Sequence, residues 1–341
     1  MNNVTRLVIL SLCAALILGS CTKKHHQPEE PLKAPLEFTA VSQNSALKSG
    51  ATKATTPLSA FHGDFGAWGI ARQEGNATPY ILWSSDSMSE VYAEPDANAA
   101  GEYTGTFIPR EPAYWLTGFA YNVIAVAPYT GGVSGLDVDH SVDTQTGKDA
   151  ITFNFDQGKK YSEGIFDFDL MGAAAATDAI TTKPTTQNLT FWHLFSQINI
   201  NVSFVDANGT AVSTGTVSQM RLCNVKSKAD YTLTFGGANN LSVACGSHTD
   251  DKTISLSGSS ATVHILPQSI TGFELYLDFT LDGAAYYDFK VNLNTTGHPT
   301  TYNWNEVYNW NITIGPKASV SFLYDVNPWD EEKVGEEIPI I

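Results

Sequence analysis

This sequence of 341 residues has little positive charge and no apolar segment long enough to span a membrane. It contains 19 Lys and Arg residues against 35 Asp and Glu residues, which gives a formal net charge of −16. A surface this acidic repels nucleic acid and anionic lipid headgroups, and basic residues form no extended cluster. We therefore expect no nucleic-acid partner. The apolar run from Leu7 to Leu18 is shorter than the about 20 residues that cross a bilayer.

The usual catalytic motifs are also missing. The sequence has no Gly-x-Ser-x-Gly, no Gly-rich phosphate loop, no His-Glu-x-x-His and no Cys-x-x-Cys. Asp167 and Asp169 share one face of a strand-like segment, but Phe166 and Phe168 alternate with them, as in an ordinary amphipathic strand. We therefore expect no catalysis, cofactor or metal. Acidic loops can hold calcium, but the acidic stretch of Asp137, Asp139, Asp143 and Asp149 does not match the EF-hand pattern, because the glycine and the closing glutamate of that pattern are misplaced.

The amino-terminal segment is typical of an exported protein. Arg6 precedes the apolar run, and small residues follow it at Gly19 and Ser20, directly before Cys21. This arrangement resembles the bacterial lipobox, which implies removal of residues 1–20 and diacylation of the Cys21 thiol. Two acyl chains hold a protein stably on a membrane, since each buried methylene contributes about 0.8 kcal/mol. We predict a lipoprotein signal peptide at 1–20 and anchoring at the outer membrane.

Few cysteines remain for other roles. Of the four in the sequence, Cys13 would leave with the signal and Cys21 would be acylated, so only Cys223 and Cys245 could pair. Both lie in strand-like segments of a protein expected in an oxidising compartment. Spacing alone leaves two alternatives open: a disulfide between them or two free thiols.

The rest of the chain has the two-residue period of half-buried strands. Residues 21–35 lack any apolar period and predict a disordered tether, so the folded part is expected from Leu36. Beyond it, apolar residues alternate with polar ones, and we predict a mostly antiparallel all-β fold. Representative rows are Ile151, Phe153, Phe155 and Ile198, Ile200, Val202, Phe204.

Two segments predict hairpins. Alternating residues from Phe273 to Leu281 and from Tyr287 to Leu293 flank Asp282-Gly283, a pair that favours a tight turn. A second pair of strands, Tyr308 to Ile314 and Val320 to Val326, flanks Gly315-Pro316.

The length predicts two domains. Residues from Ala173 to Gln187 are small and polar, which suits a link, with a short helical turn an option at its start. We place the boundary near 185 and predict two β-sandwich domains, at 36–185 and 186–341. Aromatic residues in such a protein either fill the core or, if exposed, stack on sugars; the candidates are Trp83, Trp115 and Trp192.

Several short motifs, in this order, resemble the fimbrillin-like lipoprotein subunits of Bacteroidales type V pili. The resemblance covers nearly the whole chain. The motifs are the lipobox at Cys21, Leu36-Glu-Phe-Thr-Ala-Val, Thr52-Lys53-Ala54-Thr55, Tyr121–Pro128, Asp169–Ala173, Leu189–Leu194, Tyr308–Ile314 and Val326–Trp329.

This resemblance implies two transthyretin-like sandwiches and assembly by strand exchange. In such subunits, a protease cuts after a basic residue, and a strand from another subunit fills the resulting groove. Here Leu36 to Val41 would occupy the groove, and Lys53 stands where the family typically has Arg. The surrounding Ser45–Pro57 has little to bury, as at sites that proteases prefer.

The replacement strand would come from the carboxyl end, at 320–341. The alternative is that this segment is simply the last strand of the second sandwich. The candidate donor residues are Val320, Phe322, Tyr324, Val326, Ile338 and Ile340.

We therefore expect a non-enzymatic pilus subunit at the cell surface that supports adhesion or biofilm formation. Its partners would be copies or related subunits joined by strand addition, and a lipid would hold it to the membrane before processing. Cleavage would make it a stalk subunit of the fimbrium, and an uncut, lipidated chain would be an anchor. The alternative function is a surface lipoprotein that binds glycans through Trp83, Trp115 or Trp192 and feeds a transporter.

Overall fold

Strands make up nearly all of the secondary structure, as the two-residue period predicted. The computed structural model describes residues 34–42, 65–76, 78–83, 88–95, 103–128, 137–141, 149–181, 186–235, 241–293 and 298–329. Within these ranges the helices are short, namely α3 (Gln157–Ser162) and the 3-10 turn η2 (Pro316–Ala318). No helix among the described residues is long and apolar enough to cross a bilayer.

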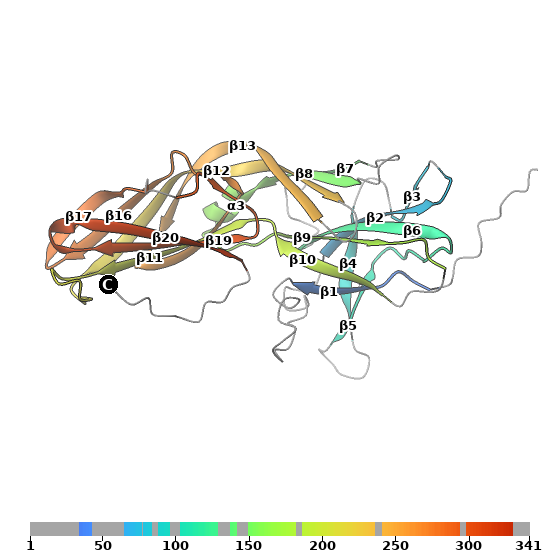
Figure 1. The fold of residues 1–341 in the computed structure, drawn as a ribbon, viewed down its shortest axis with the longest axis horizontal. Coiled ribbons are helices and arrows are strands. Elements are labelled where there is room, and N and C mark those ends of the chain that lie inside the picture. Colours follow the sequence, from blue (N-terminus) through green and yellow to red (C-terminus); the bar gives the residue numbers. More distant parts are fainter. Residues whose placement is uncertain are drawn as a thin grey trace, which may run out of the picture.

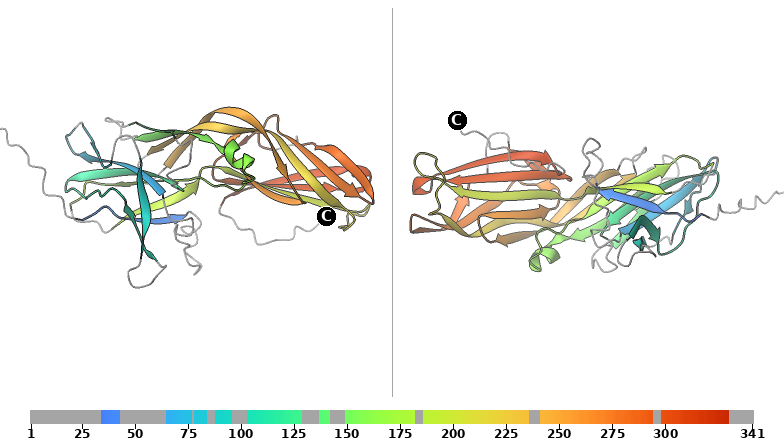
Figure 2. Two further views of the ribbon diagram at one scale, coloured as in Figure 1. Left: turned by 180° about the vertical axis from the view of Figure 1, so that it is seen from behind. Right: turned by 90° about the horizontal axis from the view of Figure 1, so that it is seen from below.

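The molecule is elongated, with an N-terminal part around β1–β6 and a C-terminal part around β16–β20 (Figures 1 and 2). The sheet of the N-terminal part closes on itself, because β2 pairs with both β4 and β6. The resulting ring of seven strands, in order of pairing, is β2 (Phe65–Gln73), β4 (Ser89–Pro95), β5 (Tyr103–Pro109), β1 (Phe38–Ser42), β10 (Gln187–His193), β9 (Met171–Thr177) and β6 (Phe119–Ala127), with β3 (Tyr80–Ile81) paired to β2.

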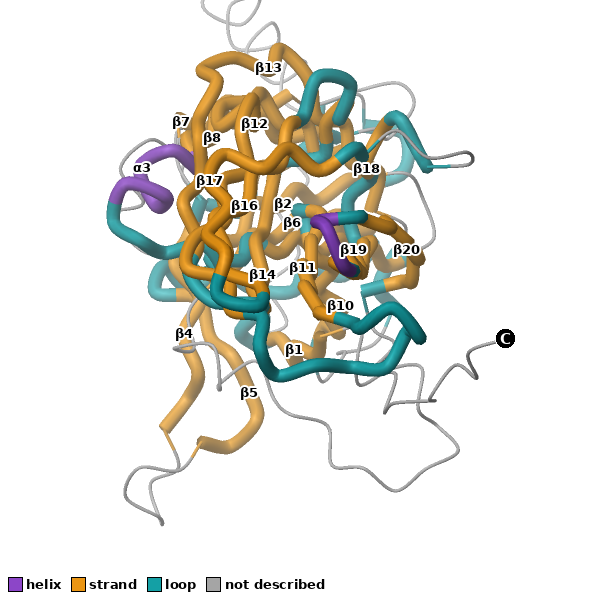
Figure 3. Tube along the Cα trace, turned by 90° about the vertical axis from the view of Figure 1, so that its left-hand side faces the viewer, coloured by secondary structure: helices purple, strands orange, loops and turns teal. Residues whose placement is uncertain are grey.

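The C-terminal part has two main sheets. Viewed along the long axis, β11, β19 and β20 lie on one side, and β12, β16 and β17 lie on the other (Figure 3). One sheet is β14 (Ser260–Ile265), β11 (Ser196–Phe204), β19 (Glu306–Ile314) and β20 (Val320–Pro328). The other is β17 (Ala284–Val291), β16 (Glu274–Leu281), β12 (Thr216–Phe235), β8 (Ala150–Asp156) and β7 (Asp137–Ser141), with β13 (Leu241–Leu256) also on β12. A small pair, β15 (Gln268–Ser269) and β18 (Thr301–Tyr302), completes this part.

Strands from both sides of residue 185 share a sheet. The long strand β12 pairs with β16 near its start and with β8 near its end, so β7 and β8 extend a sheet of the C-terminal part. The stretch that was expected to be a link begins instead with β9, which is one of the seven strands of the ring. Ala173, Ala174 and Ala175 are all buried there. Alanine is a poor strand former, but its small side chain lets both faces of β9 pack closely, so packing overrides propensity.

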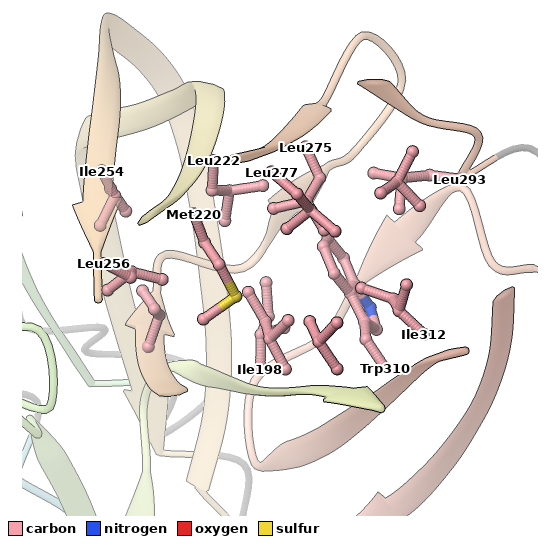
Figure 4. Close-up of a cluster of buried hydrophobic side chains, with 14 of the residues drawn as sticks. Ile198, Met220, Leu222, Ile254, Leu256, Leu275, Leu277, Leu293, Trp310 and Ile312 are labelled. Atoms are coloured by element: carbon pink, nitrogen blue, oxygen red, sulfur yellow. The ribbon is translucent and has the colours of Figure 1, made fainter. Parts of the chain in front are cut away.

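The core of the C-terminal part lies between its two sheets. Met220 and Leu222 of one sheet point toward Ile198 and Ile312 of the other, around Trp310 (Figure 4). Each belongs to an inward row with period two, which is why the sequence pattern predicted these strands. Full burial of a side chain of this size stabilises the fold by about 1.5–3 kcal/mol.

The predicted hairpin at Asp282-Gly283 is confirmed, but the inward row predicted for its second strand is wrong at Tyr287. Both turn residues have positive φ, as a two-residue hairpin turn requires. A β-bulge then adds one residue to β17, since Leu277 pairs with Phe289 while Phe279 pairs with Tyr286. The extra residue turns Tyr287 outward, where it is 76% exposed, although the alternation predicted it inside.

The turn glycine gives a testable stability effect. Gly283 has φ +79°, and open space surrounds the position of an added Cβ. We expect Gly283→Ala to lower the free energy of unfolding by about 1–2 kcal/mol, because a left-handed backbone strains an L side chain. The matched control is Gly246→Ala in β13, where the space is equally open and φ is not positive, so no loss is expected. Equal effects of the two substitutions in urea denaturation would contradict this account.

Candidate functional site

The first strand fills a row of the N-terminal core. Leu36, Phe38 and Ala40 are 0%, 0% and 5% exposed, whereas Glu37 and Thr39 between them are partly exposed. Phe38 packs edge-on against Phe65 of β2, with ring centroids 5.9 Å apart. These contacts are apolar, so shape and hydrophobicity rather than charge hold the segment in place.

The aromatic cluster around Phe38 spans the strands on both sides of β1. The Phe65 ring lies 5.4 Å from Phe107 of β5 and 5.3 Å from Phe191 of β10. Trp83 approaches Phe38 at 6.4 Å. The place that β1 occupies between β5 and β10, called the β1 slot below, is therefore an apolar groove when considered without β1.

The backbone of β1 is bonded unequally to its two neighbours. It runs parallel to β10 over five residue pairs, but it pairs antiparallel with β5 only at Phe38 and Phe107. Upstream, Leu36 N donates to Ala113 O at 2.7 Å, and Gln187 N donates to Glu37 O at 2.8 Å. Without this segment, the ring would have two unpaired strand edges.

The carboxyl-terminal candidate strand belongs to the chain's own second core. β20 pairs antiparallel with β19 over nine residue pairs, from Val320 to Pro328. Phe322 is 7% exposed and packs against Trp310 at 5.8 Å. Val320 and Tyr324 pack partly against the same core, and Val326 is 40% exposed. Residues 320–328 therefore form a strand of the second part, as the alternative to a donor strand proposed.

Several predicted positions lie outside the described residues. They are Cys21, Lys53, Ile338 and Ile340.

The two remaining cysteines are free thiols. Cys245 pairs with Tyr231 on β12, and Cys223 lies eight positions earlier on that strand, roughly 26 Å away at about 3.3 Å per residue. A disulfide needs Cα atoms within about 7 Å, so this register excludes the bond and leaves the free-thiol alternative. Burial raises the pKa of Cys245 to about 12, so its thiol stays protonated.

Most of the acidic and aromatic candidate residues that the structure describes make contacts that hold the fold together. Asp149 is buried against Arg72, and Asp169 Oδ2 lies 2.6 Å from His193 Nδ1. Within the described residues, no three His, Cys, Asp or Glu side chains gather where they could hold a metal ion. Trp83 and Trp115 are 4% and 0% exposed, so they fill the core and cannot stack on a sugar; of the three tryptophans, only Trp192 is partly accessible.

A cluster of two histidines and a tryptophan, which no sequence motif indicated, lies beside the end of β20. Trp329 stacks on His193, with ring centroids 4.2 Å apart, and is T-shaped to His264, with ring centroids 4.8 Å apart. His264 Nδ1 lies 3.1 Å from Phe168 O. The alternation in the sequence does indicate that His193 is buried, because it continues the inward row of Leu189 and Phe191 in β10.

This cluster predicts a loss of stability in acid. Burial lowers the pKa of His264 below its ordinary value of 6.5, although Asp169 and Asp167 nearby oppose the shift and His193 adds to it. The unfolded chain therefore takes up a proton on His264 at a higher pH than the folded chain does. We expect the free energy of unfolding to fall as pH drops below about 6.5, through the lower folded-state pKa.

Urea denaturation from pH 8 to pH 5 measures this effect, with His264→Gln as the comparison. The variant keeps a side-chain donor for Phe168 O but has no titrating group at this position, so its stability should change less over the same range. Identical pH dependence in both proteins would contradict the assignment to His264.

The fold and the β1 slot define an all-β protein in which β1, the first strand among the described residues, lies within a closed ring of strands. The sequence matches the family model described as fimbrillin-like over residues 65–329. This match spans most of the chain, and the chain therefore belongs to the fimbrillin-like family. No curated protein matches it significantly.

Two solved structures share the fold. One is a candidate cell adhesion protein from Bacteroides ovatus, with 14% identity, coverage of 88% of this chain and 99% of that one, and a TM-score of 0.52. The other is a fimbrial protein from Bacteroides vulgatus, with 13% identity, coverage of 86% and 99%, and a TM-score of 0.50. At these identities the likeness concerns the fold alone.

Proposed function

We propose that this protein is a structural subunit of a cell-surface pilus and that it assembles by strand exchange at the β1 slot. The observation that carries the proposal is the position of β1. It is the first strand among the described residues, and it completes the ring between β5 and β10, with Leu36 and Phe38 fully buried. Family membership and the fold shared with a fimbrial protein support the pilus role.

In this scheme, Cys21 carries the lipid after export and a protease then cuts after Lys53. The cut separates β1 from β2, so β1 is held only by non-covalent contacts. Losing Leu36 and Phe38 from the core costs about 1.5–3 kcal/mol for each side chain, and an incoming strand with a similar apolar row restores that energy. The family match begins at residue 65, beyond both β1 and Lys53, and so does not include the removable segment.

The proposed donor is the end of the chain, through Ile338 and Ile340, and β20 stays with its own subunit. Pro339 between them constrains the register, because proline offers a carbonyl but no N–H. Glu37 O accepts a bond from β10, so odd-numbered residues of β1 direct their backbone groups to β10. A donor strand that runs in the same direction as β1 keeps this hydrogen bond if Pro339 takes the place of Glu37. Ile338 then lies at the Leu36 position and Ile340 at the Phe38 position.

Peptide competition tests the exchange. We would insert a single site for a sequence-specific protease after Lys53, cut the full-length chain in detergent, and remove the released segment by dialysis in mild urea. Polymer ladders should then form on return to buffer, and a peptide of residues 34–42 should suppress them. The matched control is the same peptide with Phe38→Asp, which cannot bury its side chain in the slot and should leave the ladders intact.

Ladders that are unaffected by either peptide would overturn the β1 slot as the acceptor. Ladders that form equally well from the uncut chain would overturn the requirement for cleavage.

The position in the pilus follows from the native amino terminus. Protein taken from the cell surface that starts at Ala54 and carries no lipid would be a stalk subunit. An acylated Cys21 on the only form detected would instead identify an anchor and exclude the stalk role. Intact mass and amino-terminal sequencing measure both.

A further inference from the structure

A cavity of about 360 Å³ lies where the N-terminal ring meets the C-terminal sheet of β19 and β20. Its walls combine two partly exposed tryptophans and a valine with three polar side chains: Trp192, Trp304, Val326, Asn305, Glu306 and Asn327. Trp192 comes from β10 and Trp304 from the turn before β19. The two indole rings are 6.5 Å apart at 79°, so they form a corner and not a stacked pair.

The polar wall is held in place by neighbouring side chains. Glu306 Oε2 accepts hydrogen bonds from the Tyr308 hydroxyl and from Asn303 Nδ2, the latter at 3.1 Å. Asn327 Nδ2 donates to Asp325 Oδ2 at 2.8 Å. A fixed carboxylate and a fixed amide therefore lie beside two apolar ring surfaces, which is the mixture expected of a small-molecule site.

We infer that this cavity binds a neutral sugar ring of a glycan. A pyranose has an apolar face of C–H groups that fits an indole, and hydroxyls that can donate to Glu306 and Asn327. An acidic ligand would be repelled by Glu306 and by a chain of net charge −16. A purely apolar ligand would cover Glu306 and Asn327 without replacing their bonds to water, which is costly.

The size and position of the cavity agree with this ligand. Its volume is at the small end of the about 300–1,000 Å³ range of ligand sites, which suits one or two rings of a longer chain. Trp192 directly follows Phe191, the residue that pairs with Ser42 at the end of β1. The cavity thus begins where the β1 slot ends but takes none of its walls from β1. Sugar binding is therefore independent of the proposed strand exchange and can be measured on the uncut chain.

The test is a titration of the full-length chain in detergent with maltohexaose, cellohexaose, xylohexaose and mannohexaose, followed by tryptophan fluorescence and calorimetry. We expect saturable binding of at least one of them. Trp192→Ala and Trp304→Ala should each weaken it by at least about tenfold, since each removes one apolar wall, a change of about 1.4 kcal/mol. The matched control is Tyr287→Ala, which removes an aromatic side chain that is 76% exposed and far away on β17, and should leave binding unchanged.

A measurement on the unmodified chain guards against variants that fail to fold. The bound oligosaccharide should protect Trp192 and Trp304 from hydroxyl-radical oxidation and leave Tyr287 unprotected. Binding of none of the four sugars, or binding without protection of either tryptophan, overturns the inference. Loss of polymer ladders in the tryptophan variants without any sugar binding would assign the cavity to subunit contacts instead.

Discussion

Arg72→Met should lower the free energy of unfolding by about 3–5 kcal/mol, because it leaves a buried carboxylate without its cationic partner. Two guanidinium nitrogens of Arg72 on β2 donate to the Asp149 carboxylate, at 2.5 and 2.6 Å. The Asp149 side chain is 0% exposed, and Asn122 Nδ2 donates to it at 2.8 Å. Asp149 O also accepts from Phe235 N of β12, so the ion pair ties the ring to the neighbouring sheet.

The matched control is a second arginine–carboxylate pair at the surface. Arg110 Nε lies 2.8 Å from Glu90, but its side chain is 72% exposed. Arg110→Met removes the exposed guanidinium and leaves Glu90, whose side chain is 23% exposed, in contact with water, so the change should cost no more than about 1 kcal/mol. Urea denaturation of both variants at pH 7 measures the difference. Equal, small losses would mean that Asp149 finds another way to be solvated.

The second large effect concerns two neighbouring residues of β20. Phe322→Asp should cost at least about 3–5 kcal/mol, because it empties a buried aromatic site beside Trp310 and places a charge there. Leu323→Asp, one residue further on, should stay within about 0.5 kcal/mol because Leu323 is 67% exposed. Thermal unfolding of the uncut monomer measures both changes.

This pair also decides what β20 does. If it is the permanent edge strand of its own subunit, Phe322→Asp unfolds the monomer and Leu323→Asp leaves it intact. If β20 were instead a donor that is free in the monomer, Phe322→Asp would spare the monomer and abolish only the polymer. A charge at Phe322 is therefore no selective test of assembly, and Ile338 and Ile340 are the positions at which to apply one.

The sequence predicted what depends on local pattern. The period of two predicted an all-β chain, and Asp282-Gly283 marked a hairpin, because strand faces and tight turns are set by residues close together in the chain. The ordered motifs also led to the fimbrillin-like family, which the match over residues 65–329 confirms. The two-residue period that marked β19 also marked its inward row, from Tyr308 to Ile314.

The tertiary structure decided which strands meet and which faces are covered. Phe38 pairs with Phe107 and packs against Phe65, and nothing in the alternation of β1 alone indicates those partners. The same limit applies to Ala173–Ala176, whose composition resembled a link but whose small side chains suit a strand packed on both faces. A single β-bulge places Tyr286, and not Tyr287, on the inner face of β17, because one added residue reverses the face to which the side chains beyond it point.

The candidate sites divide in the same way. The sequence by itself placed an apolar row at Leu36, Phe38 and Ala40 and noted Trp192 as one of three aromatic candidates. Only the folded chain buried Trp83 and Trp115, brought Trp304 to Trp192, and set β1 between two strands more than 60 residues away. The physical reason is that local pattern fixes which side of a strand is apolar, whereas the partner that covers it is selected by packing across the whole chain.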